Sequence, residues 1–412
     1  MPSDNSEFFG SVFIPPSFRR YNYPLATKLA NKFPSVAISE RKFDNEMPLY
    51  IVYGEAPNAV MMWLLNGDNW KEATTDIIKA HALTQNDDLA GSNVDQLGIF
   101  APFMDLRQDQ RTRKPHPEKL NETMIVKGQA GFSQPIARLM KHVAEIDYLI
   151  GLDIHSLKAV NHFLNEGIEV VNLTAAFLIA DEVKNRGLIK DDMETIVCGV
   201  DMGNLSIVKA LSEYLDLPIA IIHKKRESIR RGTESKTSHE LVFGDVSGKR
   251  IIIIDDMISS GGTFIKTINL LLEHGAKEII ICATHPVLAS NAYYGNIQKI
   301  LGNEKVKLVM TTNSIPLMRP NDCDKDQPYI QENRNEKKLE ILNIDNFIIQ
   351  TLQILLTSKT LDQTKNNLEK NTIQLEDPYK IYEKITGKKI EKSRDTAIYR
   401  GKGKIDPLPN RQ

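Results

Sequence analysis

Residues 251–263 read Ile-Ile-Ile-Ile-Asp-Asp-Met-Ile-Ser-Ser-Gly-Gly-Thr, and this stretch decides the fold. The four isoleucines predict a short strand that is buried on both faces, as strands of parallel sheets are. Two aspartates follow at its carboxyl end. The small residues at 259–263 predict a tight turn into a helix, which Gly275 is expected to end. A second strand is expected over residues 278–284. The stretch therefore predicts one strand–helix–strand unit.

The turn in this unit has the features of a phosphate-binding site. Small residues at the start of a helix let consecutive backbone N–H groups converge on an anion, and the helix dipole adds its attraction. Asp255 and Asp256 would repel a phosphate, but they can accept hydrogen bonds from ribose hydroxyls or hold Mg²⁺ through water. A sugar phosphate would suit both the turn and the two carboxylates. No Gly-Lys-Ser/Thr follows at the spacing of a Walker A loop. The alternative is an ordinary strand-to-helix turn with incidental acids.

Length and composition limit the possible classes of protein. The chain has 412 residues, of which 41% are hydrophobic, so two or three domains with real cores are expected. A net charge of −1 gives no reason to expect nucleic acid or a membrane as partner. Three scattered cysteines exclude a disulfide framework or a cysteine zinc site. With no run of about 18 apolar residues and no signal pattern, a soluble cytoplasmic protein is expected.

Strand-like and helical segments alternate along the chain, which predicts an α/β fold with mainly parallel sheets flanked by helices. The alternation is long enough for two sheets, with a division near residue 155. The expected strands are 13–14, 36–38, 49–53, 60–65, 98–103, 148–153, 169–172, 195–200, 219–223, 251–254, 278–284, 306–310 and 339–342. The expected helices are 23–33, 70–83, 135–146, 173–186, 205–215, the one that follows residue 263, and 345–356.

Three polar segments interrupt or follow this alternation. Residues 112–128 and 319–338 are predicted to be loops because they are rich in charge, proline or asparagine. Residues 357–412 are rich in lysine and asparagine and contain few large apolar side chains. They predict either a loosely packed helical appendage or disorder. A solvated surface is favoured over nucleic-acid binding here, because acids offset much of the basic charge.

From about residue 8 to residue 356 the chain resembles the ribose-phosphate diphosphokinase family, also called phosphoribosyl pyrophosphate synthetases. Residues 251–263 resemble the phosphoribosyl pyrophosphate signature of the type I phosphoribosyltransferase fold. The other matching pieces are 44–46, 107–109, 153–155, 201–203, 224–226, 244–248, 283–286 and 314–316. The resemblance implies two tandem phosphoribosyltransferase-like domains, over 1–155 and 156–356, with the final helix able to pack on the first domain, and a polar extension over 357–412.

The resemblance also implies an activity and the residues that perform it. The family transfers the diphosphoryl group of ATP to the 1-hydroxyl of ribose 5-phosphate, with Mg²⁺, giving phosphoribosyl pyrophosphate and AMP. Asp255 and Asp256 would bind the 2- and 3-hydroxyls. Lys224 and Arg226 match a catalytic Lys-x-Arg that begins a flexible loop, and Arg226 would also contact ribose 5-phosphate. The 5-phosphate would be held by Ser259, Ser260, Gly261, Gly262 and Thr263.

His155 and Asp201 match the Mg²⁺ ligands of the family. Histidine is an unusual ligand for an ion that prefers oxygen, and without the resemblance His155 would be taken as a structural residue at a strand end. The ATP site would lie at a subunit interface, so a homo-oligomer is expected. Its residues would be Asp44, Asn45, Glu46, Arg107, Gln108 and Asp109.

Some positions depart from the family pattern. Asn45 and Asn204 stand where glycine is usual, and Ser259 stands where many members have aspartate. Two alternative functions remain: a phosphoribosyltransferase of the same fold, and a non-catalytic regulatory homologue. The tandem domains count against a single-domain transferase, and the presence of Lys224 together with the matched acids counts against a regulatory homologue.

Overall fold

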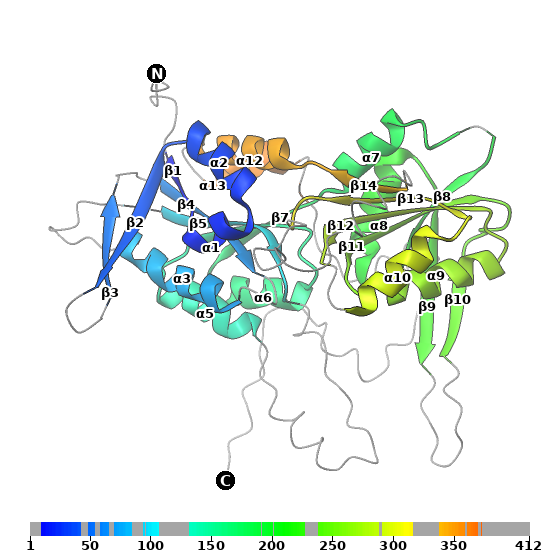
Figure 1. Cartoon of the computed structure of the whole chain (residues 1–412), viewed down its shortest axis with the longest axis horizontal. Coiled ribbons are helices and arrows are strands. Elements are labelled where there is room, and N and C mark those ends of the chain that lie inside the picture. Colours follow the sequence, from blue (N-terminus) through cyan, green and yellow to red (C-terminus); the bar gives the residue numbers. More distant parts are fainter. Residues whose placement is uncertain are drawn as a thin grey trace, which may run out of the picture.

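A computed structural model of the chain describes residues 10–42, 48–53, 58–65, 70–84, 94, 96–106, 132–190, 192–200, 202–226, 238–287, 291–315, 338–358, 361–369 and 372. These residues form two seven-stranded sheets with helices packed on both faces (Figure 1). The predicted α/β class with two largely parallel sheets is therefore confirmed. The predicted loop at 112–128, all of the predicted loop at 319–338 except its last residue, and most of the extension lie outside the described residues.

The first sheet has the strand order β3-β2-β1-β4-β5-β6-β7. All neighbours are parallel except β2 and β3, which form an antiparallel pair. The strands are β1 (Gly10–Phe13), β2 (Ser35–Lys42), β3 (Pro48–Tyr53), β4 (Asn58–Leu65), β5 (Gln96–Met104), β6 (Tyr148–Leu152) and β7 (Glu169–Leu173). Because β7 pairs with β6, this sheet runs past residue 155, where the sequence analysis divided the domains.

The second sheet repeats the same pattern, in the order β10-β9-β8-β11-β12-β13-β14, and β9 and β10 form its antiparallel pair. Its strands are β8 (Thr195–Gly199), β9 (Ile219–Arg226), β10 (Ser238–Phe243), β11 (Arg250–Ile258), β12 (Glu278–Pro286), β13 (Val306–Thr312) and β14 (Leu339–Leu342). The isoleucine run of β11 is buried along its whole length between β8 and β12, as its composition predicts. Two sheets of identical strand order indicate a tandem repeat of one fold.

The described helices are α1 (Pro16–Tyr21), α2 (Tyr23–Lys32), α3 (Trp70–Thr84), α5 (Ser133–His142), α6 (Leu157–Asn165), α7 (Ala176–Asn185), α8 (Leu205–Leu215), α9 (Gly262–Glu273), α10 (Asn291–Leu301), α12 (Asp345–Thr357) and α13 (Leu361–Leu368). The sequence patterns did not predict α1, α6 or α10. Helix α6 is short, and its start is set by the side chain of Ser156, which accepts a hydrogen bond from the amide of Ala159. None of the described helices is long and apolar enough to cross a membrane.

Helix α9 ends as predicted. Gly275 has a φ of +88°, and the amides of Gly275 and Ala276 donate to the carbonyls of Leu272 and Leu271. This is the Schellman arrangement, which favours glycine at the left-handed position. A Cβ at Gly275 would also lie 2.9 Å from Oγ of Ser247, so no other residue fits well.

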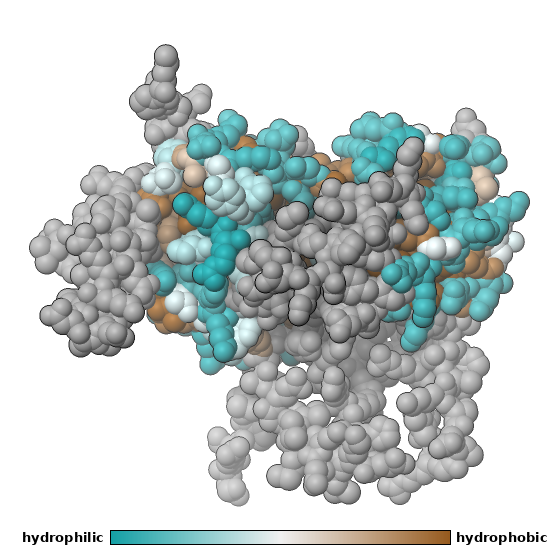
Figure 2. Space-filling view, in the orientation of Figure 1, coloured by the Kyte–Doolittle hydropathy of each residue, from teal (hydrophilic) through white to brown (hydrophobic). Residues whose placement is uncertain are grey.

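The two sheets share one hydrophobic cluster. It contains side chains from one face of each sheet, among them Ile150, Ile252 and Ile280, together with helices α2, α7, α8 and α12. Helices α3, α5 and α6 cover the other face of the first sheet, and α9 and α10 cover that of the second. On the face seen in Figure 2, hydrophilic side chains occupy most of the described surface.

Helix α12 follows the second sheet in sequence but packs on the first (Figure 1). Its residue Leu356 lies against Gly10 of β1, where a Cβ would come within 3.0 Å of the leucine side chain. The Nζ of Lys28 on α2 lies 2.5 Å from a carboxylate oxygen of Asp345. The chain therefore crosses between the sheets twice, once between β7 and β8 and once before α12.

Because the cluster is shared, we expect a cavity-forming substitution in α12 to destabilise both sheets. Leu352 on α12 is fully buried, and its replacement by alanine should lower the free energy of unfolding by about 2–5 kcal/mol. Hydrogen exchange should become faster in β1 and also in β13. The matched control is Gln353→Ala at the neighbouring exposed position, which should change little. Faster exchange in the first sheet alone would contradict a shared core.

Candidate active site

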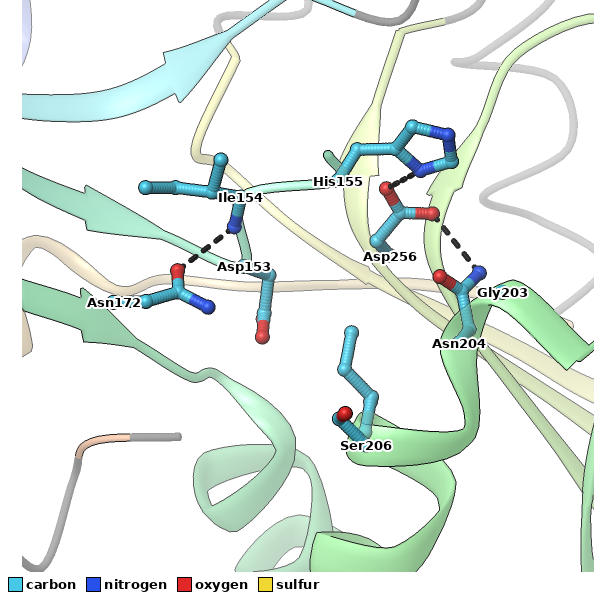
Figure 3. A pocket seen from close by; sticks show the side chains of 9 residues that line it. Asp153, Ile154, His155, Asn172, Gly203, Asn204, Ser206 and Asp256 are labelled. Atoms are coloured by element: carbon cyan, nitrogen blue, oxygen red, sulfur yellow. Dashed lines mark hydrogen bonds and ion pairs between the residues drawn. The ribbon is translucent and has the colours of Figure 1, made fainter. Parts of the chain in front are cut away.

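The carboxyl ends of strands from both sheets meet at one place, and a small pocket opens there (Figure 3). The contributing strands are β6 of the first sheet and β11 and β12 of the second. Parallel α/β sheets bind ligands at the carboxyl ends of their strands, so this is the expected position for a site. The pocket is lined by Asp153, Ile154, His155, Asn172, Gly203, Asn204, Ser206, Ile207 and Asp256.

His155 and Asp256 form the central contact. Nδ1 of His155, from the turn after β6, lies 2.5 Å from Oδ2 of Asp256 on β11. The other oxygen of Asp256 accepts from the side-chain amide of Asn204 at 3.2 Å (Figure 3). Burial by itself would raise the pKa of Asp256, but electrostatic attraction to His155 and the hydrogen bond from its ring outweigh burial, so this pKa is lowered. Because an ionised carboxylate can only accept, Nδ1 of His155 carries the proton.

Asp153 lies deeper in the same pocket and has an unusual backbone, with a φ of +41°. Its Oδ2 accepts from Oγ1 of Thr284 at 2.5 Å and from the amide of Ala175 at 3.0 Å. Burial raises the pKa of this carboxyl to about 6. Among the described residues, its Oδ1 has no hydrogen-bond partner, and neither has Nδ2 of Asn172. Two buried polar atoms at a pocket are therefore available to a ligand or to water.

Thr284 belongs to the second sheet and Asp153 to the first, so their hydrogen bond joins the domains. His285 adds a second connection of this kind. Its Nε2 donates to the carbonyl of Leu152 at 3.0 Å, and its Nδ1 lies 2.9 Å from the hydroxyl of Ser314. Burial lowers the pKa of His285 to about 4, so the ring is neutral at physiological pH. These bonds place the end of β12 against the end of β6.

The predicted phosphate turn has open backbone donors. Gly261 precedes α9 with a φ of +74°. The amide of Gly262 donates to Oγ of Ser260 at a long 3.5 Å, and the first-turn amides lie at the turn, where a helix has no intrahelical acceptors for them. Asn296 on α10 donates to the carbonyl of Ser260 at 2.8 Å and fixes the turn from outside. A Cβ at Gly261 would lie 3.3 Å from Cβ of Asn296, and the positive φ disfavours one as well. This arrangement is suited to an anion such as a phosphate.

The residues at His155 are compatible with a divalent cation. A carboxylate that holds one nitrogen of a histidine orients the other toward a metal, and Asp256 holds His155 in this way. Asp153 adds to the same pocket a carboxylate oxygen that has no hydrogen-bond partner among the described residues. Within the described part of the chain, no three His, Cys, Asp or Glu side chains form a metal site by themselves. Asp201, the second expected ligand, lies outside the described residues.

The structure brings only some of the predicted residues together. His155 meets Asp256, while Asp255, Ser259, Ser260, Gly261, Gly262 and Thr263 follow along β11 and the start of α9. The backbones of Lys224 and Arg226 lie on β9, opposite Glu240 and Ser238 of β10. The strand therefore continues past residue 223 to Arg226, and residues 227–237, where the flexible loop was expected, lie outside the described residues. Asp44, Asn45, Glu46, Arg107, Gln108 and Asp109 lie outside the described residues.

Sequence reasoning missed several contributors. Asn204 was noticed only as a departure from glycine, yet it binds Asp256. Asn172 at the end of β7 accepts the amide hydrogen of Ile154 at 2.8 Å, and Asn296 holds the phosphate turn. All three are asparagines at strand ends or on helices, and only their distant partners reveal their roles.

Comparison with known proteins supports one family. The phosphoribosyl transferase domain model matches residues 171–306. A protein of Streptococcus pyogenes named ribose-phosphate pyrophosphokinase 1 is 32% identical over 216 residues, which cover 52% of this chain and 60% of that protein. The chain thus matches less than two thirds of the length of this relative. A crystal structure of phosphoribosylpyrophosphate synthetase from Mycobacterium smegmatis shares the fold, with a TM-score of 0.58, 23% identity, and coverage of 84% of this chain and 98% of that one.

A longer match comes from Listeria monocytogenes. Its putative ribose-phosphate pyrophosphokinase 2 is 30% identical over 310 residues, which cover 73% of this chain and 87% of that protein. The repeated sheet order, the pocket between the domains and the matches thus agree with the resemblance seen in the sequence, and the chain belongs to the ribose-phosphate pyrophosphokinase family.

Proposed function

We propose that this protein transfers the diphosphoryl group of MgATP to the 1-hydroxyl of ribose 5-phosphate, giving phosphoribosyl pyrophosphate and AMP. The single observation that best supports the proposal is the contact of His155 with Asp256. It brings the residue expected to hold the metal of the nucleotide against β11, the strand whose carboxyl end is expected to bind the sugar through Asp255. A transfer between these two substrates needs them side by side, and the contact supports that arrangement.

The sugar would bind along β11 and the start of α9. The open amides after Gly261 are suited to the 5-phosphate, and the hydroxyls of Ser260 and Thr263, both exposed, can add hydrogen bonds. Asp255 is the more accessible of the two acids for the ribose hydroxyls. Both oxygens of Asp256 already hold donors from the protein, so its main task would be to orient His155.

In the proposed reaction, the 1-hydroxyl oxygen attacks the β-phosphorus of ATP. The bond from this phosphorus to the oxygen shared with the α-phosphate breaks, and the hydroxyl proton is released. Mg²⁺, when bound, would supply positive charge to offset the charge that develops on the phosphate oxygens. Lys224 and Arg226 would add positive charge from the end of β9, and His155 would hold the ion together with Asp201.

The direct test is to incubate the purified full-length protein with MgATP and ribose 5-phosphate and to quantify AMP and phosphoribosyl pyrophosphate. Equal amounts of both products are expected. A phosphoribosyltransferase would form no AMP and would instead consume phosphoribosyl pyrophosphate with a nucleobase. Absence of AMP while ribose 5-phosphate still binds would contradict the proposal and favour the regulatory homologue.

Lys224→Ala tests the catalytic assignment. Removal of one cationic group that acts mainly in the transition state should lower kcat by about 10²–10³-fold. The affinity for ribose 5-phosphate, measured by calorimetry, should remain nearly unchanged. The matched control is Lys266→Ala on the exposed side of α9, which should leave kcat unaltered. An unchanged rate for Lys224→Ala would show that this residue has another role.

Thr284→Val tests the hydrogen bond across the domains. The change should cost about 1–3 kcal/mol of unfolding free energy at pH 7.5, where Asp153 is ionised and loses a donor. The pKa of Asp153 is about 6 in the fold, above its ordinary value of 3.8, so the carboxyl is protonated at pH 5 and needs that donor less. The cost should therefore shrink at pH 5.

The control for this experiment is Thr267→Val. Thr267 is equally buried, but its hydroxyl has no partner among the described residues. This variant should be neutral or slightly stabilising at both pH values, because no hydrogen bond is lost. Denaturant unfolding at pH 5 and pH 7.5 measures both variants. If the cost of Thr284→Val did not change with pH, the contribution of Thr284 to stability would not depend on the ionisation of Asp153, which would contradict this prediction.

A further inference from the structure

The C-terminal extension is in part an ordered piece of the first domain. Residues 361–369 and 372, here called the C-terminal strap, consist of helix α13 and a short bridge to the first sheet. Leu368 on α13 is fully buried in the hydrophobic cluster that the two sheets share. The helix packs beside α12 (Figure 1). Of the two alternatives that the sequence left open, this part forms the helical appendage.

The strap contacts the edge strand of the first sheet at both ends. β7 is the last strand in the sheet order, so among the described residues one side of its backbone has no neighbouring long strand. At its start, Glu169 pairs with Lys365 of α13, and at its end Leu173 forms an antiparallel bridge with Thr372. An edge strand held in this way frays less and is shielded from pairing with other chains.

The same strand supports the turn that enters the site. The carbonyl of Leu173 accepts the amide hydrogen of Asp153 at 2.8 Å, and the side chain of Asn172 accepts that of Ile154, also at 2.8 Å. Asp153 occupies the left-handed region, which an aspartate adopts only when its surroundings hold it there. Leu173 therefore touches the strap through Thr372 and the turn through Asp153. His155 follows two residues later.

We propose that the C-terminal strap is a positioning element for the site. By holding β7 at both ends, it keeps the turn of residues 153–155 in the conformation in which His155 meets Asp256. No residue of the strap is among those that line the pocket, and its contacts with Glu169 and Leu173 connect it to the site through β7. Its effect on turnover rests on the proposed function, but its effect on the conformation of the turn does not.

Substitutions in the ion pair of Lys365 and Glu169 perturb the strap mildly, and a charge swap can compensate for the first change. The two side chains are 37% and 53% exposed, so reversing one charge should loosen the strap without unfolding the domain. Hydrogen exchange of the full-length protein, followed by mass spectrometry, reports the opening of each segment. In Lys365→Glu, the amides of residues 153–155 should exchange about threefold faster. The charge-swapped double variant Lys365→Glu/Glu169→Lys should restore the original rate.

A stronger perturbation uses the buried anchor. Leu368→Ala should accelerate exchange of the same turn by about tenfold or more, because a fully buried leucine contributes much to the docking of α13. Asn366→Ala, at an exposed position of the same helix, is the matched control and should leave exchange unchanged. In the presence of both substrates, kcat should fall in step with the loss of protection at the turn.

Two results would overturn the proposal. One is an unaltered exchange rate at residues 153–155 in Lys365→Glu, whether or not the strap itself opens. The other is failure of the charge swap to restore protection after Lys365→Glu has removed it. If the protein made no phosphoribosyl pyrophosphate at all, the exchange measurements would still decide the role of the strap, since they require no catalysis.

Discussion

The hydrogen bond between His155 and Asp256 joins the carboxyl ends of strands that belong to different sheets. In each sheet, the polar side chains at the carboxyl ends of the parallel strands lie at one edge. The pocket is lined from both of these edges, so each sheet contributes only part of it. The two edges face each other since the hydrophobic cluster under both sheets and the crossing of α12 hold the domains together. Thr284 and His285 then fix the separation of β6 and β12 by hydrogen bonds. The site thus depends on how the domains are packed as well as on its own residues.

Burial gives the two acids of the pocket different electrostatic properties. Asp256 keeps a lowered pKa because His155 and Asn204 compensate for the loss of water. Asp153 has neutral donors from Thr284 and Ala175, and burial raises its pKa to about 6. One carboxylate is therefore firmly ionised and suited to orient a cation ligand, whereas the other changes its charge close to physiological pH. The difference arises from partners in distant parts of the chain, so substitutions outside the pocket can alter the site.

The sequence predicted what depends on local pattern and failed where the partner is distant. The isoleucine run of β11, the glycine turn before α9 and the stop at Gly275 have strong local signals, and the structure has them as expected. Strand β10 was missed because Ser238 and Glu240 make it look like a polar loop, and only pairing with β9 makes it a strand. The contact of His155 with Asp256 spans 101 positions, and no pattern in the sequence shows it. Leu368 stands in a polar segment, so its burial could not be foreseen from composition.

The central claim is that the two domains complete one site through the contact of His155 with Asp256. A double-mutant cycle with His155→Asn, Asp256→Asn and the double variant measures that contact most directly, with the free energy of unfolding as the readout. Each single change removes the charge-assisted hydrogen bond, so the double variant should be less destabilised than the sum of the single ones, by about 1–3 kcal/mol. Effects that add within about 0.3–0.5 kcal/mol would show that the two residues are not coupled and would contradict the account.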